Sequence, residues 1–111
     1  MTMKRYFNTT LGISMLPDGD LSVETVTEEA AAQYLLGEIE NVANPQHSNS
    51  LQAITQKLGV DVRNAKGGRV FLASGDSCLV AEIGGIPRET REFSDEEIAA
   101  AKFTFRLVIV G

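Results

Sequence analysis

Two stretches near the start of the chain predict strands, and in the second of them apolar and polar residues alternate with a period of two. The first covers residues 4–8 and is followed by MLPDGD, a stretch rich in turn-forming residues. The second covers residues 21–27, where Leu21, Val23 and Thr25 share one face and polar side chains occupy the other. We therefore expect this second strand to be buried on one face.

The apolar period then changes to three and four residues, which is typical of amphipathic helices. Thr27 suits an N-cap, and the run rich in alanine and leucine after it predicts a helix over residues 28–38. Further along, Leu51, Ile54 and Leu58 recur at helical spacing. These three residues are expected to form the buried stripe of a second helix.

The second helix is predicted to begin in the sequence NPQHS and to end at Gly59. Asparagine is a favoured N-cap and proline suits the first helical position, so His47, the only histidine, falls in the first turn. Ser50 belongs to the same general face of the helix, because residues three or four apart are neighbours on a helix surface.

Two apolar runs in the second half, residues 69–73 and 78–85, are separated by the turn sequence SGDS and predict a β-hairpin. The second run is apolar almost throughout, which favours a central strand with neighbours on both sides. Ser94 and Glu97 form the pattern of a capping box, which predicts the start of a third helix. The β-rich residues 102–110 predict a final strand inside the sheet.

The predicted order is β-β-α-α-β-β-α-β in a single domain that covers residues 1–111. This order favours the α/β (α+β) class, with a mixed β-sheet of about five strands covered by helices. A chain of 111 residues, of which 43% are hydrophobic, is large enough to enclose one continuous core.

Composition excludes several classes of function. A formal net charge of −5 argues against binding to duplex nucleic acid, which depends on many lysines and arginines. The N-terminal stretch YFNTTLGISML is too short and too polar for a signal-peptide core or a membrane span, so a cytoplasmic protein is expected.

Cys78 lies in an apolar run and is expected to be a buried free thiol. Phosphate-loop, zinc and catalytic-triad patterns are absent from the sequence, so neither a cofactor nor a metal is predicted.

Among residues with useful chemistry, His47 is notable because it can exchange protons near neutral pH. A helix N-terminus disfavours the charged imidazole and attracts anions such as phosphate, which suits an acid–base group beside a phosphodiester. The alternative is an ordinary exposed histidine near a helix cap, and the residues alone favour that alternative. Other polar candidates lie at strand ends and in loops, where they can line a pocket or be solvated: Asn8, Ser14, Arg69, Arg88 and Glu89.

Four stretches carry a resemblance that covers nearly the whole chain: YFNTTLGISML, HSNSLQAITQKLGV, RVFLASGDSCLVAEIGG and FSDEEI. Together they resemble a small family of proteins from archaeal viruses, phages and bacterial mobile elements. Its best-understood branch is the viral type III anti-CRISPR ring nucleases, which destroy the signalling molecule cyclic tetra-adenylate. On this resemblance His47 aligns with the catalytic histidine and Glu89 with its acidic partner. The implied ligand-binding residues are Asn8, Ser14, Ser50, Arg69 and Arg88.

The resemblance also implies a homodimer that binds a cyclic oligoadenylate across its two-fold axis and cleaves it without a metal. In that chemistry a ribose 2′-hydroxyl attacks the adjacent phosphate, and His47 protonates the departing 5′-oxygen. Arg69 and Arg88 balance the charge on the phosphate. The implied role is evasion of host defence by a phage or mobile element, in the host cytoplasm.

Three positions depart from the family pattern: Leu11, Gln46 and Ile86 stand where a serine, a glycine and an arginine are expected. Arg88 takes the place of that arginine only after a shift of the alignment. Two alternatives to a nuclease therefore stay open. One is a binding module of the same fold that sequesters a nucleotide signal without cleaving it. The other is an acidic protein that inhibits a host defence protein by imitating nucleic acid.

Overall fold

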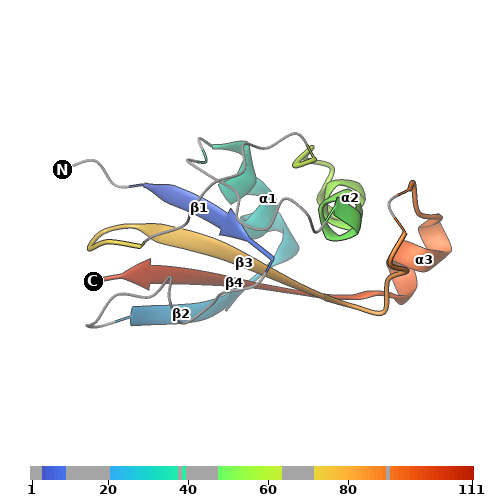
Figure 1. Ribbon diagram of the computed structural model, residues 1–111. Coiled ribbons are helices and arrows are strands. Elements are labelled where there is room, and N and C mark those ends of the chain that lie inside the picture. Colours follow the sequence, from blue (N-terminus) through green and yellow to red (C-terminus); the bar gives the residue numbers. More distant parts are fainter. Residues whose placement is uncertain (1–3, 10–20, 38, 40–47, 64–71, 90) are drawn as a thin grey trace.

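The structure, a computed structural model, describes residues 4–9, 21–37, 39, 48–63, 72–89 and 91–111. Within these residues a four-stranded mixed sheet is combined with three helices (Figure 1). The strands are β1 (Arg5–Asn8), β2 (Leu21–Val26), β3 (Ser77–Gly84) and β4 (Lys102–Val110). The helices are α1 (Glu28–Leu36), α2 (Ser48–Leu58) and α3 (Asp95–Ala100). The α/β class predicted from the sequence is confirmed.

The strand order in the sheet is β1-β3-β4-β2, with β1 parallel to β3 and the other two pairs antiparallel. β3 therefore has neighbours on both sides, and β4 lies inside the sheet between β3 and β2. Both placements confirm the sequence prediction. The sequence indicated both placements because a strand buried on both faces has apolar side chains at successive positions, and such strands lie inside the sheet.

The predicted hairpin between residues 69–73 and 78–85 is wrong, and the described residues give four strands in the order β-β-α-α-β-α-β. A hairpin partner would pair with residues 77–80 at the start of β3. However, β1 and β4 already occupy both edges of that segment. The last two residues of the predicted first strand, Leu72 and Ala73, lie outside every strand, and the rest of it lies outside the described residues.

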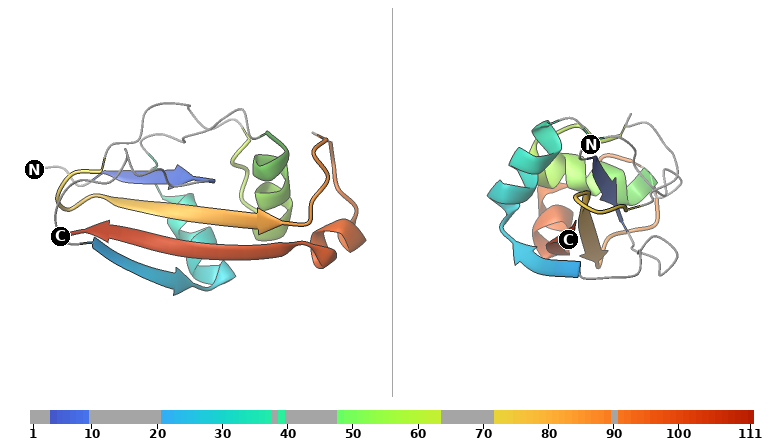
Figure 2. Two further views of the ribbon diagram at one scale, coloured as in Figure 1. Left: turned by 60° about the horizontal axis from the view of Figure 1, so that its bottom comes forward. Right: turned by 90° about the vertical axis from the view of Figure 1, so that its left-hand side faces the viewer.

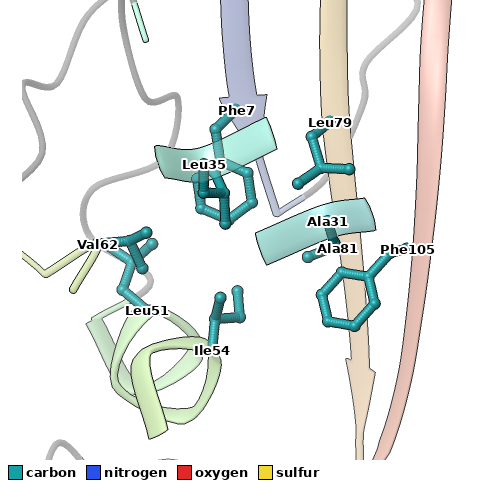
Figure 3. Close-up of a cluster of buried hydrophobic side chains, with 9 residues drawn as sticks. All are labelled: Phe7, Ala31, Leu35, Leu51, Ile54, Val62, Leu79, Ala81 and Phe105. Atoms are coloured by element: carbon teal, nitrogen blue, oxygen red, sulfur yellow. The ribbon is translucent and has the colours of Figure 1, made fainter. Parts of the chain in front are cut away.

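The main hydrophobic core lies between the sheet and two helices. α1 and α2 cover one face of the sheet, whereas α3 lies beyond the end of β3 and β4 (Figure 1, Figure 2). Figure 3 shows the buried side chains that meet in this layer: Phe7, Ala31, Leu35, Leu51, Ile54, Val62, Leu79, Ala81 and Phe105. The predicted stripe of α2 is confirmed, because Leu51 and Ile54 are buried here and Leu58 packs against them partly buried.

A second apolar cluster is centred on the opposite face of the sheet: Tyr6, Leu72, Cys78, Val80, Val108 and Val110. Side chains alternate between the two faces along each strand, so neighbours such as Phe7 and Leu79 belong to the main core instead. Cys78 is fully buried, and this burial raises the pKa of its thiol to about 12. The predicted buried free thiol is confirmed.

β2 lies at the edge of the sheet, and the face predicted to be buried is exposed. Leu21 and Val23 are 36% and 57% exposed. They pair with Val110 and Val108 of β4, which are the last buried residues on that side of the sheet. The alternation along β2 identified its two faces correctly. The error arose because the burial of a face depends on what packs over the edge of the sheet, and not on the strand itself.

The helix ends follow the predicted capping signals. The hydroxyl of Thr27 accepts a hydrogen bond from the backbone of the first turn of α1, at 3.1 Å. Ser94 and Glu97 form a complete capping box at the start of α3. Gly59 ends α2 with φ at 72°, a left-handed conformation that favours glycine. α1 ends at Leu36, slightly before the predicted residue 38.

Candidate functional site

The first turn of α2 lies against the loop that follows β3. Gly85 has φ at 85°, which lets the chain turn sharply as it leaves the strand. Asn49 Nδ2 then donates a hydrogen bond to the carbonyl oxygen of Pro87 at 3.1 Å. This contact joins the start of α2, which follows His47 in the sequence, to the loop segment that carries Arg88.

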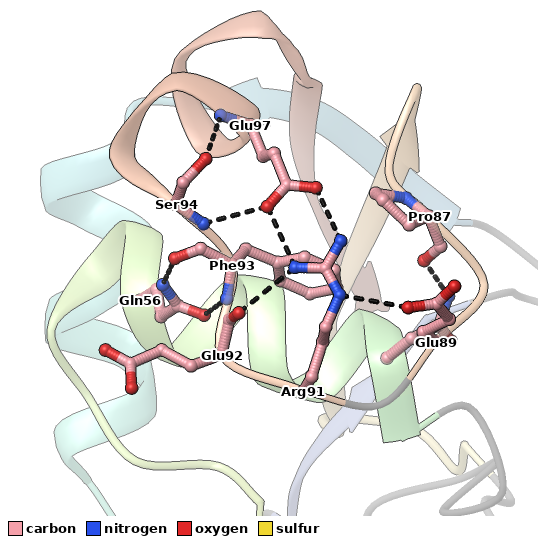
Figure 4. A network of polar contacts seen from close by, with 9 residues as sticks. Gln56, Pro87, Glu89, Arg91, Glu92, Phe93, Ser94 and Glu97 are labelled. Carbon is pink, nitrogen blue, oxygen red and sulfur yellow. Dashed lines mark hydrogen bonds and ion pairs between the residues drawn. The ribbon is translucent and has the colours of Figure 1, made fainter.

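Two turns further along α2, the side chain of Gln56 binds the end of the same loop (Figure 4). Its Nε2 donates to the carbonyl oxygen of Phe93 at 2.7 Å, and its Oε1 accepts from the Phe93 backbone N–H at 2.8 Å. Gln52 Nε2 donates to the same Oε1 at 2.9 Å and so orients the amide. Because the Phe93 ring is also buried, the loop is fixed at this point by both its main chain and its side chain.

Arg91, a residue of the loop, connects the loop to α3. Its Nη1 and Nη2 donate to the two carboxylate oxygens of Glu97 at 2.9 and 2.7 Å, and its Nε donates to Glu89 Oε2 at 3.0 Å (Figure 4). The hydrogen bonds from Arg91 are the main reason that the pKa of Glu97 falls from 4.5 to about 2. The same contact with Glu97 raises the pKa of Arg91. The Arg91 guanidinium is therefore engaged in holding the loop.

The described residues include four of the predicted site residues: Asn8, Ser50, Arg88 and Glu89. Asn8 is the last residue of β1, and its fully buried side chain offers no surface to solvent. Ser50 is partly exposed in the first turn of α2. Arg88 is exposed, and no hydrogen bond or ion pair of its side chain occurs within the described part of the chain. Glu89 is exposed and paired with Arg91.

The structure brings only some of these residues together. The contact between Asn49 and Pro87 brings the helix turn of Ser50 and the loop of Arg88 side by side. The other predicted site residues lie outside the described residues, so their roles stay predictions: Ser14, His47 and Arg69.

Sequence reasoning missed Asn49 and Gln56, which hold the loop from α2, and it named Arg91 only as a charged loop residue, without its bond to Glu97. A signal was present for the first two, because Asn49, Gln52 and Gln56 recur at spacings of three and four and so share one face of α2. A polar stripe beside the buried apolar stripe indicates a helix face that meets another polar segment. The bond between Arg91 and Glu97 had no such signal, because the sequence explained Glu97 as part of the capping box alone.

The described residues contain no group of three or more histidine, cysteine, aspartate or glutamate side chains that could hold a metal ion. In the same part of the chain, every helix is too short or too polar to cross a membrane.

Comparison with family models and with curated proteins finds no match to this sequence. A solved structure does match: B116 of Sulfolobus turreted icosahedral virus, with a TM-score of 0.77 and 19% sequence identity. The match covers 96% of this chain and 98% of B116. The chain has the B116 fold. B116 comes from a virus, and the motifs of this sequence resemble a family found in archaeal viruses, so the fold agrees with the one that the resemblance implies.

Proposed function

We propose that this chain binds a cyclic oligoadenylate and cleaves one of its phosphodiester bonds. The observation that carries the proposal is the likeness to B116 over 96% of the chain. The motifs of the sequence independently resemble the ring nucleases of the family to which B116 belongs. A similarity in fold and a similarity in short motifs therefore favour the same family chemistry.

The contact between α2 and the loop after β3 supports the proposed site. His47 directly precedes α2 in the sequence, and Asn49 holds the first turn of that helix against Pro87. Arg88 follows Pro87 and is exposed. Backbone N–H groups at a helix N-terminus and a guanidinium both attract phosphate, so a phosphodiester bound at this point meets both.

In the proposed reaction a ribose 2′-oxygen forms a bond to the adjacent phosphorus while the bond from phosphorus to the 5′-oxygen breaks. His47 donates a proton to that 5′-oxygen, and the proton of the 2′-hydroxyl passes to solvent. The products carry a 2′,3′-cyclic phosphate and a 5′-hydroxyl. Arg69 and Arg88 stabilise the charge on the phosphoryl oxygens. The remaining ligand contacts come from Ser14 and Ser50, whereas the fully buried Asn8 has no surface that touches the ring.

Glu89 favours a second candidate function. Its carboxylate is bound through Oε2 to Arg91 at 3.0 Å, so Arg91 competes with His47 for it. If the pair persists in the complex, the chain holds the ring without efficient cleavage. The second candidate is therefore a module that sequesters the same nucleotide signal.

We further propose that two copies of the chain bind one ring across a two-fold axis. A cyclic oligoadenylate with an even number of nucleotides has matching symmetry, and a dimer presents each phosphate-binding residue twice. This doubling concentrates positive charge in one cleft of the dimer, although each chain has a net charge of −5. In this role the protein removes the messenger of a host defence system in the cytoplasm, on behalf of a phage or mobile element.

Labelled cyclic tetra-adenylate tests both candidates in one experiment. The protein is incubated with the ring in EDTA, and products are separated by chromatography while a parallel sample is passed through a protein-retaining filter. Linear products support cleavage, and an intact ring retained on the filter supports sequestration. An intact ring that passes through the filter contradicts both, and cleavage that returns only with Mg²⁺ contradicts the metal-free chemistry.

A further inference from the structure

We infer that Gln56 is a positioning residue for the proposed reaction, because it fixes the main chain of the loop that carries Arg88. The inference rests on the proposed function and adds a residue that the sequence motifs do not assign to the site. Gln56 lies on α2, well away from the start of the helix. It therefore acts on the site through the loop, without touching the ligand.

The side-chain amide of Gln56 binds the backbone of Phe93 as a neighbouring strand would. One hydrogen bond runs from Nε2 to the Phe93 carbonyl at 2.7 Å, and the other from the Phe93 N–H to Oε1 at 2.8 Å. Both bonds can form only if the donor and the acceptor of the amide face the loop in one orientation. The hydrogen bond from Gln52 to Oε1, at 2.9 Å, selects that orientation.

Arg88 lies between two points at which α2 holds the loop backbone. Asn49 binds the carbonyl oxygen of Pro87, the residue before Arg88, and Gln56 binds Phe93. The two helix residues are seven positions apart and so lie two turns apart on one face. α2 thus holds the chain on both sides of Arg88, at Pro87 and at Phe93.

The other arginine of the loop cannot take the place of Arg88. The Nε, Nη1 and Nη2 atoms of Arg91 donate to Glu89 and to both oxygens of Glu97. Arg88 is exposed and makes no such contact within the described part of the chain. It is therefore the guanidinium that a phosphate can reach, and its usefulness depends on where the loop backbone is held.

Replacement of Gln56 by methionine tests the inference, because methionine has a similar length and packs similarly but forms neither hydrogen bond. The matched control is Gln33→Met, at an exposed position of α1. With labelled cyclic tetra-adenylate as substrate, we expect Gln56→Met to lower kcat by about 10- to 100-fold, since small misplacements of a positioned group cost that much. The control is expected to keep the kcat of the original protein, and the KM of both variants is expected to change little.

A double variant separates positioning from general loss of stability. If Gln56 acts through Arg88, then Gln56→Met has no further effect on kcat once Arg88 is replaced by alanine. A variant that only lowers the folded fraction reduces kcat by the same factor in both backgrounds. Multiplied losses in the double variant therefore overturn the inference.

Hydrogen exchange distinguishes failure of the inference from failure of the proposed function. In Gln56→Met, the backbone N–H of Phe93 loses its acceptor and is expected to exchange faster, with unchanged exchange in the strands. Fast exchange with unchanged kcat overturns the positioning role and leaves the nuclease proposal standing. Unchanged exchange also overturns the positioning role. If the original protein neither binds nor cleaves the ring, the proposed function fails and the positioning role fails with it, whatever the exchange shows.

Discussion

Arg91 and Glu97 form a bidentate ion pair between the loop after β3 and α3, with nitrogen to oxygen distances of 2.9 and 2.7 Å. Glu97 also completes the capping box of α3 by accepting from the Ser94 backbone N–H at 2.9 Å. One carboxylate therefore joins the helix start to the loop. Protonation of this carboxylate weakens both contacts at once.

This arrangement predicts a loss of stability in acid. Because the pKa of Glu97 is lowered to about 2, its contribution is fully present above its ordinary value of 4.5 and is lost as pH falls toward 2. The variant Glu97→Gln is expected to melt at a lower temperature than the original protein at pH 7. The difference is expected to shrink between pH 4.5 and pH 2. Thermal unfolding followed by circular dichroism over this range measures it.

Glu96→Gln serves as the control, because Glu96 is an exposed neighbour in the same turn of α3. Its melting temperature is expected to stay close to that of the original protein throughout. A difference between Glu97→Gln and the original protein that is constant from pH 7 to pH 2 contradicts the role of the charged carboxylate.

Asp76 is predicted to be important for stability, because its buried carboxylate binds two separate segments. Oδ1 accepts from the Lys4 backbone N–H and Oδ2 from the Ala73 backbone N–H, each at 2.9 Å. In Asp76→Asn one acceptor becomes an NH₂ group that faces a backbone donor. We expect the free energy of unfolding in urea to fall by about 2–3 kcal/mol. The exposed Asp95→Asn is expected to lose about 0.5 kcal/mol, and equal losses in the two variants rule this role out.

Cys78 is predicted to be unreactive in the folded protein. Burial raises the pKa of its thiol to about 12, so almost no thiolate forms at pH 8, and the fully buried sulfur is out of reach of reagents. A thiol-specific chromogenic disulfide is expected to leave the native protein unlabelled and to react with one equivalent after denaturation in guanidinium. Complete labelling of the native protein within minutes would disprove the buried placement.

The elements that were predicted correctly are those in which local sequence decides the structure. A cap at Thr27, a capping box at Ser94 and a helix end at Gly59 depend on residues within one turn, so each could be located from the sequence. The central position of β3 was also predictable, because burial on both faces leaves an apolar run.

The errors arose where distant parts of the chain meet. Residues 69–73 have a strand-like sequence, but β1, from the other end of the chain, occupies the edge of β3 that a hairpin would need. The exposure of Val23 depends in the same way on what covers the sheet beyond its edge. Gln56 and Phe93 are 37 positions apart, and neither residue type alone indicates that the two bind each other.

The candidate site was predictable only in part, because its residues come from distant parts of the chain. A short motif indicated candidate site residues near the start of α2, and the structure shows that the helix start and the loop of Arg88 are neighbours. The ion pair between Glu89 and Arg91 was not predictable, because both residues sit in a charged loop where several pairings are equally compatible with the sequence.

The central claim is that His47 drives cleavage of a cyclic oligoadenylate, and single-turnover kinetics in EDTA test it most directly. The protein is mixed in excess with labelled cyclic tetra-adenylate, and the rate constant is compared with that of His47→Ala and of the control Gln46→Ala. We predict a rate constant about 10²–10⁴-fold lower in His47→Ala, with binding of the ring retained, and little change in the control. Equal rate constants for His47→Ala and the original protein, or no cleavage by the original protein, would contradict the account.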